Sequence, residues 1–423
     1  MSASRIIDVV LEPPVPWTIA SQPDRFERRR TLESFGLDPD RPVVVVGHQP
    51  TFWHAGILAK FLAADALVER CNGQLVHLVI DGHRGRFGHV AWPQADDEGG
   101  LRSVTWQFRS CDEHHAMGTQ PACPPSPCPG DAPEGLGRIG AALQEFADAS
   151  DAAWQHAEAL NRLVDPVVGP RTTITTTELM ASPSGTMLLD RMADDAEACR
   201  AKYNAAVASD PTLGIARLDS GELPMWSVDD QLELRTSRVT DPKGVRRFPK
   251  ALWTTALARL GLGDCFIHGV GGGRYDVFME QWIQAWLQER PCPMFVASAS
   301  VLLPLGTAEQ WRAMRQMRIA EARRRRHDPA VLRGSGPSSA KAAMLQEIDD
   351  LPVNSSERRA AFRRMHDTLR GHPAAGVGVL TDEEQRRLAQ AQQVATDRTW
   401  AFPLHDAEAL QQLRTEVRSR FGS

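Results

Sequence analysis

The sequence lacks the features that mark membrane, disulfide-rich and nucleic-acid-binding proteins. No window approaches the roughly 18 apolar residues that a membrane-spanning helix needs, and residues 1–8 contain no apolar core of a signal peptide. The seven cysteines form no CxxC pair, so we expect reduced thiols. The formal net charge of −5 argues against a surface built for nucleic acid. We therefore expect a cytoplasmic protein that binds neither membranes nor nucleic acids.

The standard catalytic and metal-binding signatures are also missing. The chain contains no phosphate-binding Walker motif, no GxSxG and no HExxH. Cysteines and histidines do gather in one segment rich in proline and glycine, but their spacing matches no standard zinc pattern. These residues are Cys111, His114, His115, Cys123 and Cys128. We expect this segment to be an inserted loop that binds no metal.

The chain is long enough for more than one domain. It has 423 residues, of which 42% are hydrophobic and 24% charged, as in ordinary globular proteins. We expect an α/β core over residues 1–304, with a loop-rich insertion at 93–137. A helical arm follows at 305–375, and residues 376–423 return to the core with a helix and a strand.

The core pattern predicts a Rossmann-like parallel sheet. A β-branched run at 41–47, a helical pattern at 57–67 and an apolar run at 74–80 form a strand–helix–strand unit. Further strands are expected at 264–268 and 293–298, and an edge strand within 213–226, because Pro224 cannot donate to a central ladder. Helices are expected at 140–164, 186–208, 253–260 and 274–289.

The arm is predicted from helical stretches that are rich in arginine and glutamate. A capping-box signal at 307–310 opens a helix that runs to residue 326, and two further helical stretches end at Gly371 and Pro373. We expect a helical hairpin or coiled coil that dimerises the protein. A last helix is expected at 381–398 and a returning strand at 400–404.

The first group of candidate site residues follows the first core strand. Gly47, His48, Gln49 and His54 lie between this strand and the next helix. Ligands gather at the carboxyl ends of parallel strands, and a helix N-terminus there favours anions. The imidazoles could transfer protons near neutral pH. The alternative is structural: His48 caps the turn, and His54 packs on Trp53.

Two further groups follow other core strands. Asp81 and His83, with His89, follow the second strand, where a carboxylate beside an imidazole can orient a base, contact an amine or bind a metal. The alternative is a solvated turn in which Asp81 is a local cap. A glycine-rich loop follows the later strand and could form an anion-binding nest or a purely structural turn. The residues of this third group are His268, Gly269, Gly271, Gly272, Tyr275 and Asp276.

These segments resemble the cysteine-adding enzymes of bacillithiol biosynthesis, also called cysteine ligases. Residues 47–50 resemble the TGQQ segment of that family, residues 81–83 with 89–90 its E-D-H…N-H-V stretch, and residues 266–272 its GGPGE loop. A divergent branch carries a TGHQ…WHPG segment, an ELPFW strand and IHGIGGxxYD. Asn204 and Lys250 also match that branch. His48, His54 and His268 depart from the main family pattern, and the acidic residue that closes its glycine loop is missing here.

The resemblance implies a Rossmann-like core, a dimerising arm and a ligase reaction. The reaction would join cysteine to the amino group of an amino-sugar conjugate, with ATP as a possible cosubstrate. His48 or His83 would take the proton of the amine, and Asp81 would orient it. Two alternatives stay open: a non-catalytic nucleotide- or metabolite-binding dimer, and a nucleotidyl-transferase-like enzyme.

Overall fold

A computed structural model gives the structure of the protein and describes residues 4–19, 21–95, 100–242, 244–306, 308–327, 339–370 and 382–421. The chain divides into two compact units. The larger unit comprises Met1–Trp92, Thr105–Leu303 and Arg398–Ser423. The smaller unit comprises Pro93–Val104 and Pro304–Asp397.

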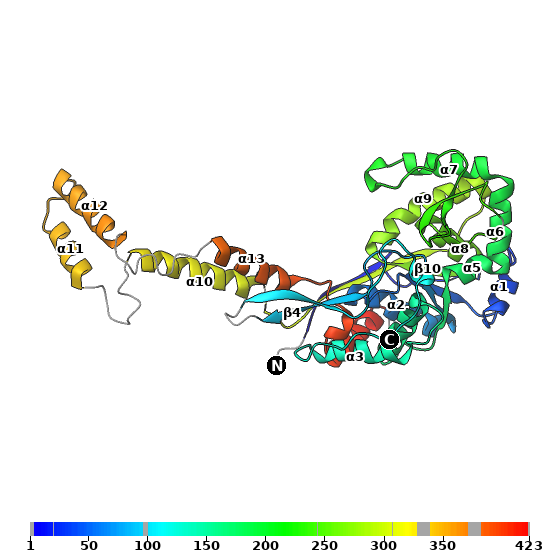
Figure 1. Cartoon of the computed structure of the whole chain (residues 1–423), viewed down its shortest axis with the longest axis horizontal. Helices are drawn as coiled ribbons and strands as arrows, with labels where there is room; N and C mark the ends of the chain where they lie inside the picture. The colour runs from blue at the N-terminus through cyan, green and yellow to red at the C-terminus, as the bar shows by residue number, and fades with distance from the viewer. Residues whose placement is uncertain are drawn as a thin grey trace. The chain divides into compact units, whose positions relative to one another are not determined.

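A six-stranded, mainly parallel sheet forms the centre of the larger unit (Figure 1). Its strands, in spatial order, are β1 (Arg5–Glu12), β11 (Met294–Leu302), β10 (Cys265–His268), β2 (Val43–His48), β3 (Gln74–Val79) and β6 (Thr172–Thr175). Only β1 runs antiparallel to its neighbour. Numbered along the chain, the five parallel strands lie in the order 3-2-1-4-5 of a doubly wound sheet. The predicted parallel α/β sheet is confirmed.

Helices cover both faces of this sheet, so its central strands are buried on both sides. Val44 and Val46 pack against α2 (Ala55–Cys71), α4 (Ala152–Val164) and α14 (Ala407–Arg420). Val43 and Val45 point the other way, because successive side chains of a strand alternate. They join a core with α7 (Ala196–Ala208), α8 (Ala251–Gly261) and α9 (Val270–Leu287). This burial explains the continuous valine run of β2.

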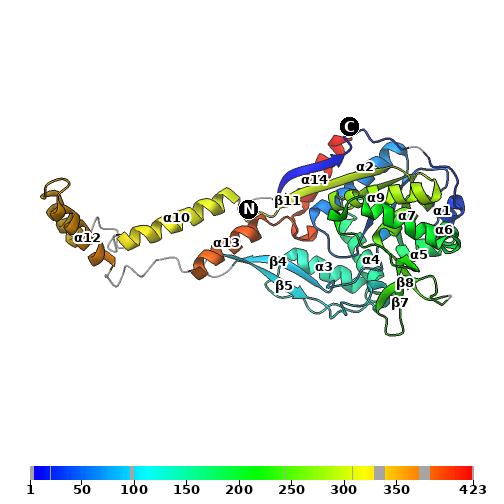
Figure 2. The ribbon, with the colours of Figure 1, turned by 90° about the horizontal axis from the view of Figure 1, so that it is seen from above.

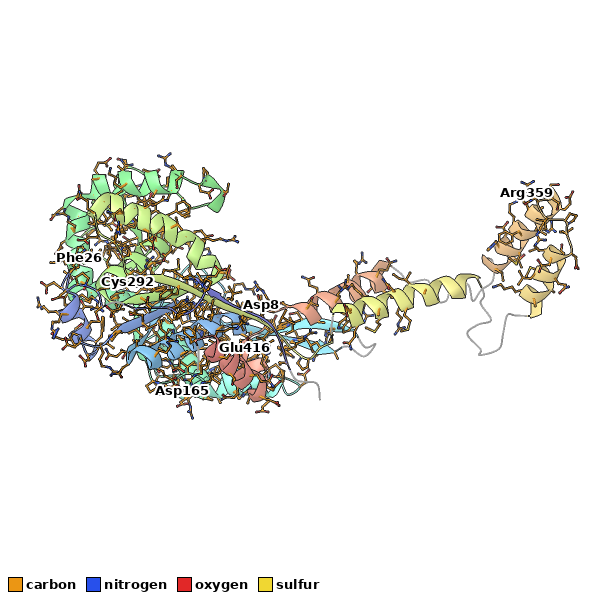
Figure 3. All side chains as sticks on the ribbon, turned by 180° about the vertical axis from the view of Figure 1, so that it is seen from behind. Asp8, Phe26, Asp165, Cys292, Arg359 and Glu416 are labelled. Carbon is orange, nitrogen blue, oxygen red and sulfur yellow. The ribbon has the colours of Figure 1, made fainter. Side chains whose placement is uncertain are left out.

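The remaining elements of the larger unit connect these layers. They are α1 (Arg28–Ser34), α3 (Glu134–Glu145), α5 (Thr176–Ala181), α6 (Pro183–Asp194) and short 3₁₀ turns at Met117–Thr119, Pro211–Leu213 and Phe402–Leu404. All seven cysteines are free thiols. Figure 3 labels Cys292, which is buried inside this unit.

Two expectations for the middle of the chain were wrong. Part of the expected loop region 93–137 is a strand pair, β4 (His89–Ala95) with β5 (Leu101–Gln107), seen side by side in Figure 2. The expected edge strand is β7 (Glu222–Val228), which lies between β8 (Leu234–Arg238) and β9 (Arg247–Pro249). Pro224 is tolerated there because the β7–β8 register is interrupted between Glu222 and Trp226, where no regular ladder requires its missing N–H.

The smaller unit consists largely of helices. In it α10 (Ala308–His327) packs on α13 (Asp382–Thr396) around Trp311, and α11 (Ser339–Asp349) packs on α12 (Ser356–Arg370) around Ile348 and Met365. Figure 3 labels Arg359 on this second pair. The expected helix stop at Gly371 and Pro373 lies outside the described residues. None of the described helices is long and apolar enough to cross a membrane.

The end of the chain differs from the expectation. Helix α13 belongs to the smaller unit and not to the core. The expected strand at 400–404 is a single β-bridge, between His54 and Ala401, followed by a 3₁₀ turn. The helix α14, which the sequence reading missed, then packs on the sheet through Leu410 and Leu413.

Candidate active site

The carboxyl ends of β2 and β10 mark the switch point of the sheet. From β2 the chain crosses to β3 through α2 on one face, and from β10 it crosses to β11 through α9 on the other. Two neighbouring strands whose connections diverge in this way leave a crevice between their carboxyl ends, where doubly wound proteins bind ligands. The crevice here is a cavity of 740 Å³ in the larger unit.

Most of the residues expected at the site line this cavity. The four imidazoles of His48, His54, His83 and His268 face it, which is the placement that the sequence predicts. The other expected residues in its lining are Gly47, Gln49, Lys250, Gly269, Gly271, Gly272 and Tyr275. Three segments that are far apart in the sequence therefore meet at one cavity.

Hydrogen bonds fix His48 in one tautomer. Its Nδ1 lies 3.0 Å from the carbonyl oxygen of Gln49, and a carbonyl can only accept, so Nδ1 carries the proton. Burial lowers the pKa of His48 well below its ordinary value, and the charge of Lys60 lowers it further. The neutral ring therefore keeps a lone pair on Nε2.

His54 is fixed in the opposite tautomer. It is the N-cap of α2, and its Nδ1 accepts a hydrogen bond of 3.0 Å from the backbone N–H of Gly56. In the neutral ring, the proton then lies on Nε2. The cavity thus contains one imidazole with a free Nε2 lone pair and one with an Nε2 proton. The cap also occupies an amide of the α2 N-terminus that we expected to be available to an anion.

The expected glycine loop is the first turn of α9. The N-cap Gly269 has no side chain, and no side chain of the residues that the structure describes caps the helix. A Cβ at Gly272 would lie 2.4 Å from Nδ1 of His268, so the helix approaches this ring as closely as only glycine allows. A Cβ at Gly271 would meet nothing within 4 Å. The start of α9 therefore presents backbone amides and an open space to the cavity.

Lys60 is one of the cavity residues that the sequence did not predict. It lies on α2 with 3% of its surface exposed, and its Nζ donates a hydrogen bond of 2.8 Å to the carbonyl oxygen of Gly47. Burial lowers the pKa of Lys60 from 10.5 to about 7. The available signal was a single charged residue in the otherwise apolar helix stretch 55–64.

Four expected site residues do not line the cavity: Asp81, His89, Asn204 and Asp276. Asp81 is buried, which raises its pKa. It accepts hydrogen bonds from the hydroxyls of Thr176 and Thr177 at the start of α5. The expectation that Asp81 orients an imidazole was wrong, because both of its carboxylate oxygens bind these threonine hydroxyls.

Asn204 and His89 are also placed away from the cavity. Asn204 binds the backbone of Leu218 twice, through its Nδ2 at 2.8 Å and its Oδ1 at 2.7 Å, so its amide holds α7 against the segment before β7. His89 begins β4. Both residues match motifs of the family that the sequence resembles, but in the structure Asn204 supports packing and His89 belongs to a strand.

Asp276 is buried behind the residues that line the cavity. Its Oδ2 lies 2.7 Å from Nη1 of the buried Arg259. The same oxygen lies 3.2 Å from Nε2 of His268, at ion-pair distance but without the alignment of a hydrogen bond. We expected Asp276 to contact a ligand. Instead it points inward from α9, balances the charge of Arg259 and lies beside His268.

The charge of the lining is one-sided. It includes Lys60, Arg84, Lys250 and Arg398 besides the four histidines, and no aspartate or glutamate among the described residues. One of these cations, Lys250, is paired with the buried Glu222 behind the lining, at 2.5 Å. The indole ring of Trp226 contacts two of these cations, with its centroid 5.3 Å from Cζ of Arg84 and 4.3 Å from Nζ of Lys250. In a chain whose net charge is negative, this lining favours an anionic ligand.

No group of three metal-ligating side chains comes together in the part of the chain that the structure describes. Comparison with known proteins adds no family. The sequence matches no protein-family model and no curated protein. The case for a function therefore rests on the cavity itself.

Proposed function

We propose that the protein is a carbon–nitrogen ligase that joins a cysteine-like amino acid to a small amine, such as an amino-sugar conjugate. The observation that carries this proposal is the convergence of four histidines and Lys60 on one cavity at the switch point. The three segments that resemble the cysteine-adding enzymes all contribute to that cavity. ATP as the source of an activated acyl group belongs to the same proposal.

The two tautomers support acyl transfer to an amine. The amine nitrogen attacks the activated carbonyl carbon, a C–N bond forms, and the C–O bond to the anionic leaving group breaks. The lone pair on Nε2 of His48 takes the proton of the amine, and Nε2–H of His54 donates a hydrogen bond to the departing oxygen.

Turnover tests the proposal directly. The full-length protein is incubated with ATP, cysteine and glucosaminyl-malate, and the products are identified by mass spectrometry. We expect an amide conjugate, and we expect His48→Ala to lower its rate of formation about 100-fold or more, the usual contribution of a proton-transfer group. His114→Ala, which changes an exposed imidazole, is the matched control.

Other outcomes separate the alternatives. Pyrophosphate release without an amide product would favour a nucleotidyl transferase. Nucleotide binding that raises the melting temperature without any turnover would favour a binding protein. Wild-type turnover in both His48→Ala and His83→Ala would contradict the roles assigned to these imidazoles.

The finer description of the fold belongs to the same proposal. We propose a Rossmann-like core, for which the 3-2-1-4-5 strand order is the support. We further propose that the smaller unit is a coiled-coil arm that pairs with a second copy, supported by the exposed apolar side chains of Val353 and Phe362. Light scattering would report a monomer if this is wrong. The seven free thiols fit the reducing cytoplasm.

A further inference from the structure

In its protonated form, Lys60 carries a buried positive charge that no carboxylate of the described residues balances. Among the described residues, the carbonyl oxygen of Gly47 is the single hydrogen-bond partner of its Nζ, and no carboxylate lies within ion-pair distance. An ammonium group has three N–H donors, so two remain unused. Buried charges are normally paired, and the missing partner here points to a ligand in the cavity.

The uncapped start of α9 lies next to this lysine. A Cβ at Gly269 would lie 3.8 Å from Cδ of Lys60. The start of α9 and the side chain of Lys60 are therefore neighbours in the cavity lining, and the space beside Gly271 is open. Amides and an ammonium group are the donors that phosphate and carboxylate groups prefer.

The groups that face Lys60 leave its charge uncompensated. His48 of β2 and His77 of β3 are its nearest titratable neighbours, and burial lowers the pKa of both, so both rings are neutral at physiological pH. Gly269, between β10 and α9, has no side chain. An anion entering the cavity would therefore supply the only negative charge at this position among the described residues.

We propose that Lys60 and the first turn of α9 form a subsite for one anionic group of the ligand, a phosphate or a carboxylate, and that Lys60 takes up a proton when this group binds. The subsite rests on the proposed function and deepens it, because it assigns a place to the anionic part of the substrate. The bound anion stabilises the ammonium form, and the proton comes from solvent.

Calorimetry on the full-length protein tests this subsite. Pyrophosphate and citrate are titrated separately at pH 8 in two buffers with different ionisation enthalpies, which reports the protons taken up per bound anion. At this pH most of Lys60 is neutral in the free protein, so we expect uptake of close to one proton. Lys60→Met should abolish that part of the uptake and weaken binding about 10- to 100-fold. Lys202→Met, on the exposed side of α7, is the control.

A glycine pair tests the helix start independently of the lysine. Gly271→Ala places a methyl group in the open space of the subsite and should weaken anion binding at least about fivefold. Gly137→Ala also adds a methyl group without a clash on a helix, α3, but outside the cavity lining, and should leave binding unchanged.

The outcomes are separable. Pyrophosphate binding alone would identify the anion as a phosphate, citrate binding alone as a carboxylate, and either supports the subsite. Failure of both anions to bind, or equal affinity and proton uptake in Lys60→Met and wild type, would overturn it. Anion binding without amide synthesis would overturn the ligase proposal and leave the subsite standing. Amide synthesis by the wild type, together with normal anion binding by Lys60→Met, would overturn the subsite and leave the ligase proposal standing.

Discussion

Replacing Lys60 with methionine should stabilise the protein, although it removes a hydrogen bond. Lys60 is 3% exposed, and its pKa is about 7 in the folded state against 10.5 ordinarily. Between these two pH values the unfolded chain holds a proton that the folded chain does not. The free energy of unfolding of the wild type therefore rises with pH in this window. Methionine has a similar length and no charge to desolvate.

The pKa difference sets the size of this effect. The buried lysine lowers the free energy of unfolding by about 4 kcal/mol at pH 7 and by about 2 kcal/mol at pH 9. The hydrogen bond from Lys60 to Gly47 raises the free energy of unfolding by about 1 kcal/mol at either pH, which offsets part of this loss. We expect Lys60→Met to be more stable than the wild type at pH 7, and this advantage to shrink by about 2 kcal/mol by pH 9.

Urea unfolding followed by tryptophan fluorescence measures this difference. Every tryptophan except Trp311 belongs to the larger unit, so the signal reports mainly the unit that contains Lys60. Lys202→Met serves as the control for loss of a charge at an exposed position. A stability difference between Lys60→Met and wild type that stays constant from pH 7 to pH 9 would refute the reasoning, because a lysine of ordinary pKa keeps its proton throughout this range.

Three further changes test the packing around the site. Gly82→Ala would place a Cβ 2.7 Å from Cβ of Phe248, and we expect it to lower the free energy of unfolding by about 1–3 kcal/mol in urea titrations; wild-type stability would show that this turn can move freely. Burial lowers the pKa of His156 to about 3, so stability should fall as the pH drops from 6.5, and His156→Phe should reduce the slope of stability against pH by up to about 1.4 kcal/mol per unit. An unchanged slope in that variant would mean that the ring already titrates normally. Asp276→Asn leaves the guanidinium of Arg259 with Glu280 as its remaining acidic partner, and thermal unfolding should report a loss of about 3 kcal/mol; a melting temperature equal to that of the wild type would contradict this account of the pair.

The sequence determined the sheet and the position of the site. A valine run that ends in glycine can be buried on both faces only as a central strand. Polar residues at the ends of such strands must then gather at one edge of the sheet. For this reason His48, His54, His83 and His268 were placed at one cavity from their local patterns alone. The local pattern of apolar and polar residues is therefore enough to predict the sheet and the position of the site.

The partners of individual polar groups were decided only by the tertiary structure. Asp81 follows a strand in the same way as His83, yet it binds two threonines that lie about 95 residues later in the chain. Asn204 holds a loop and not a ligand. Lys60 reads in the sequence as one cation on a helix and becomes significant only because burial removes it from water. Hydrogen-bond partners and desolvation depend on residues distant in sequence, and no local pattern contains them.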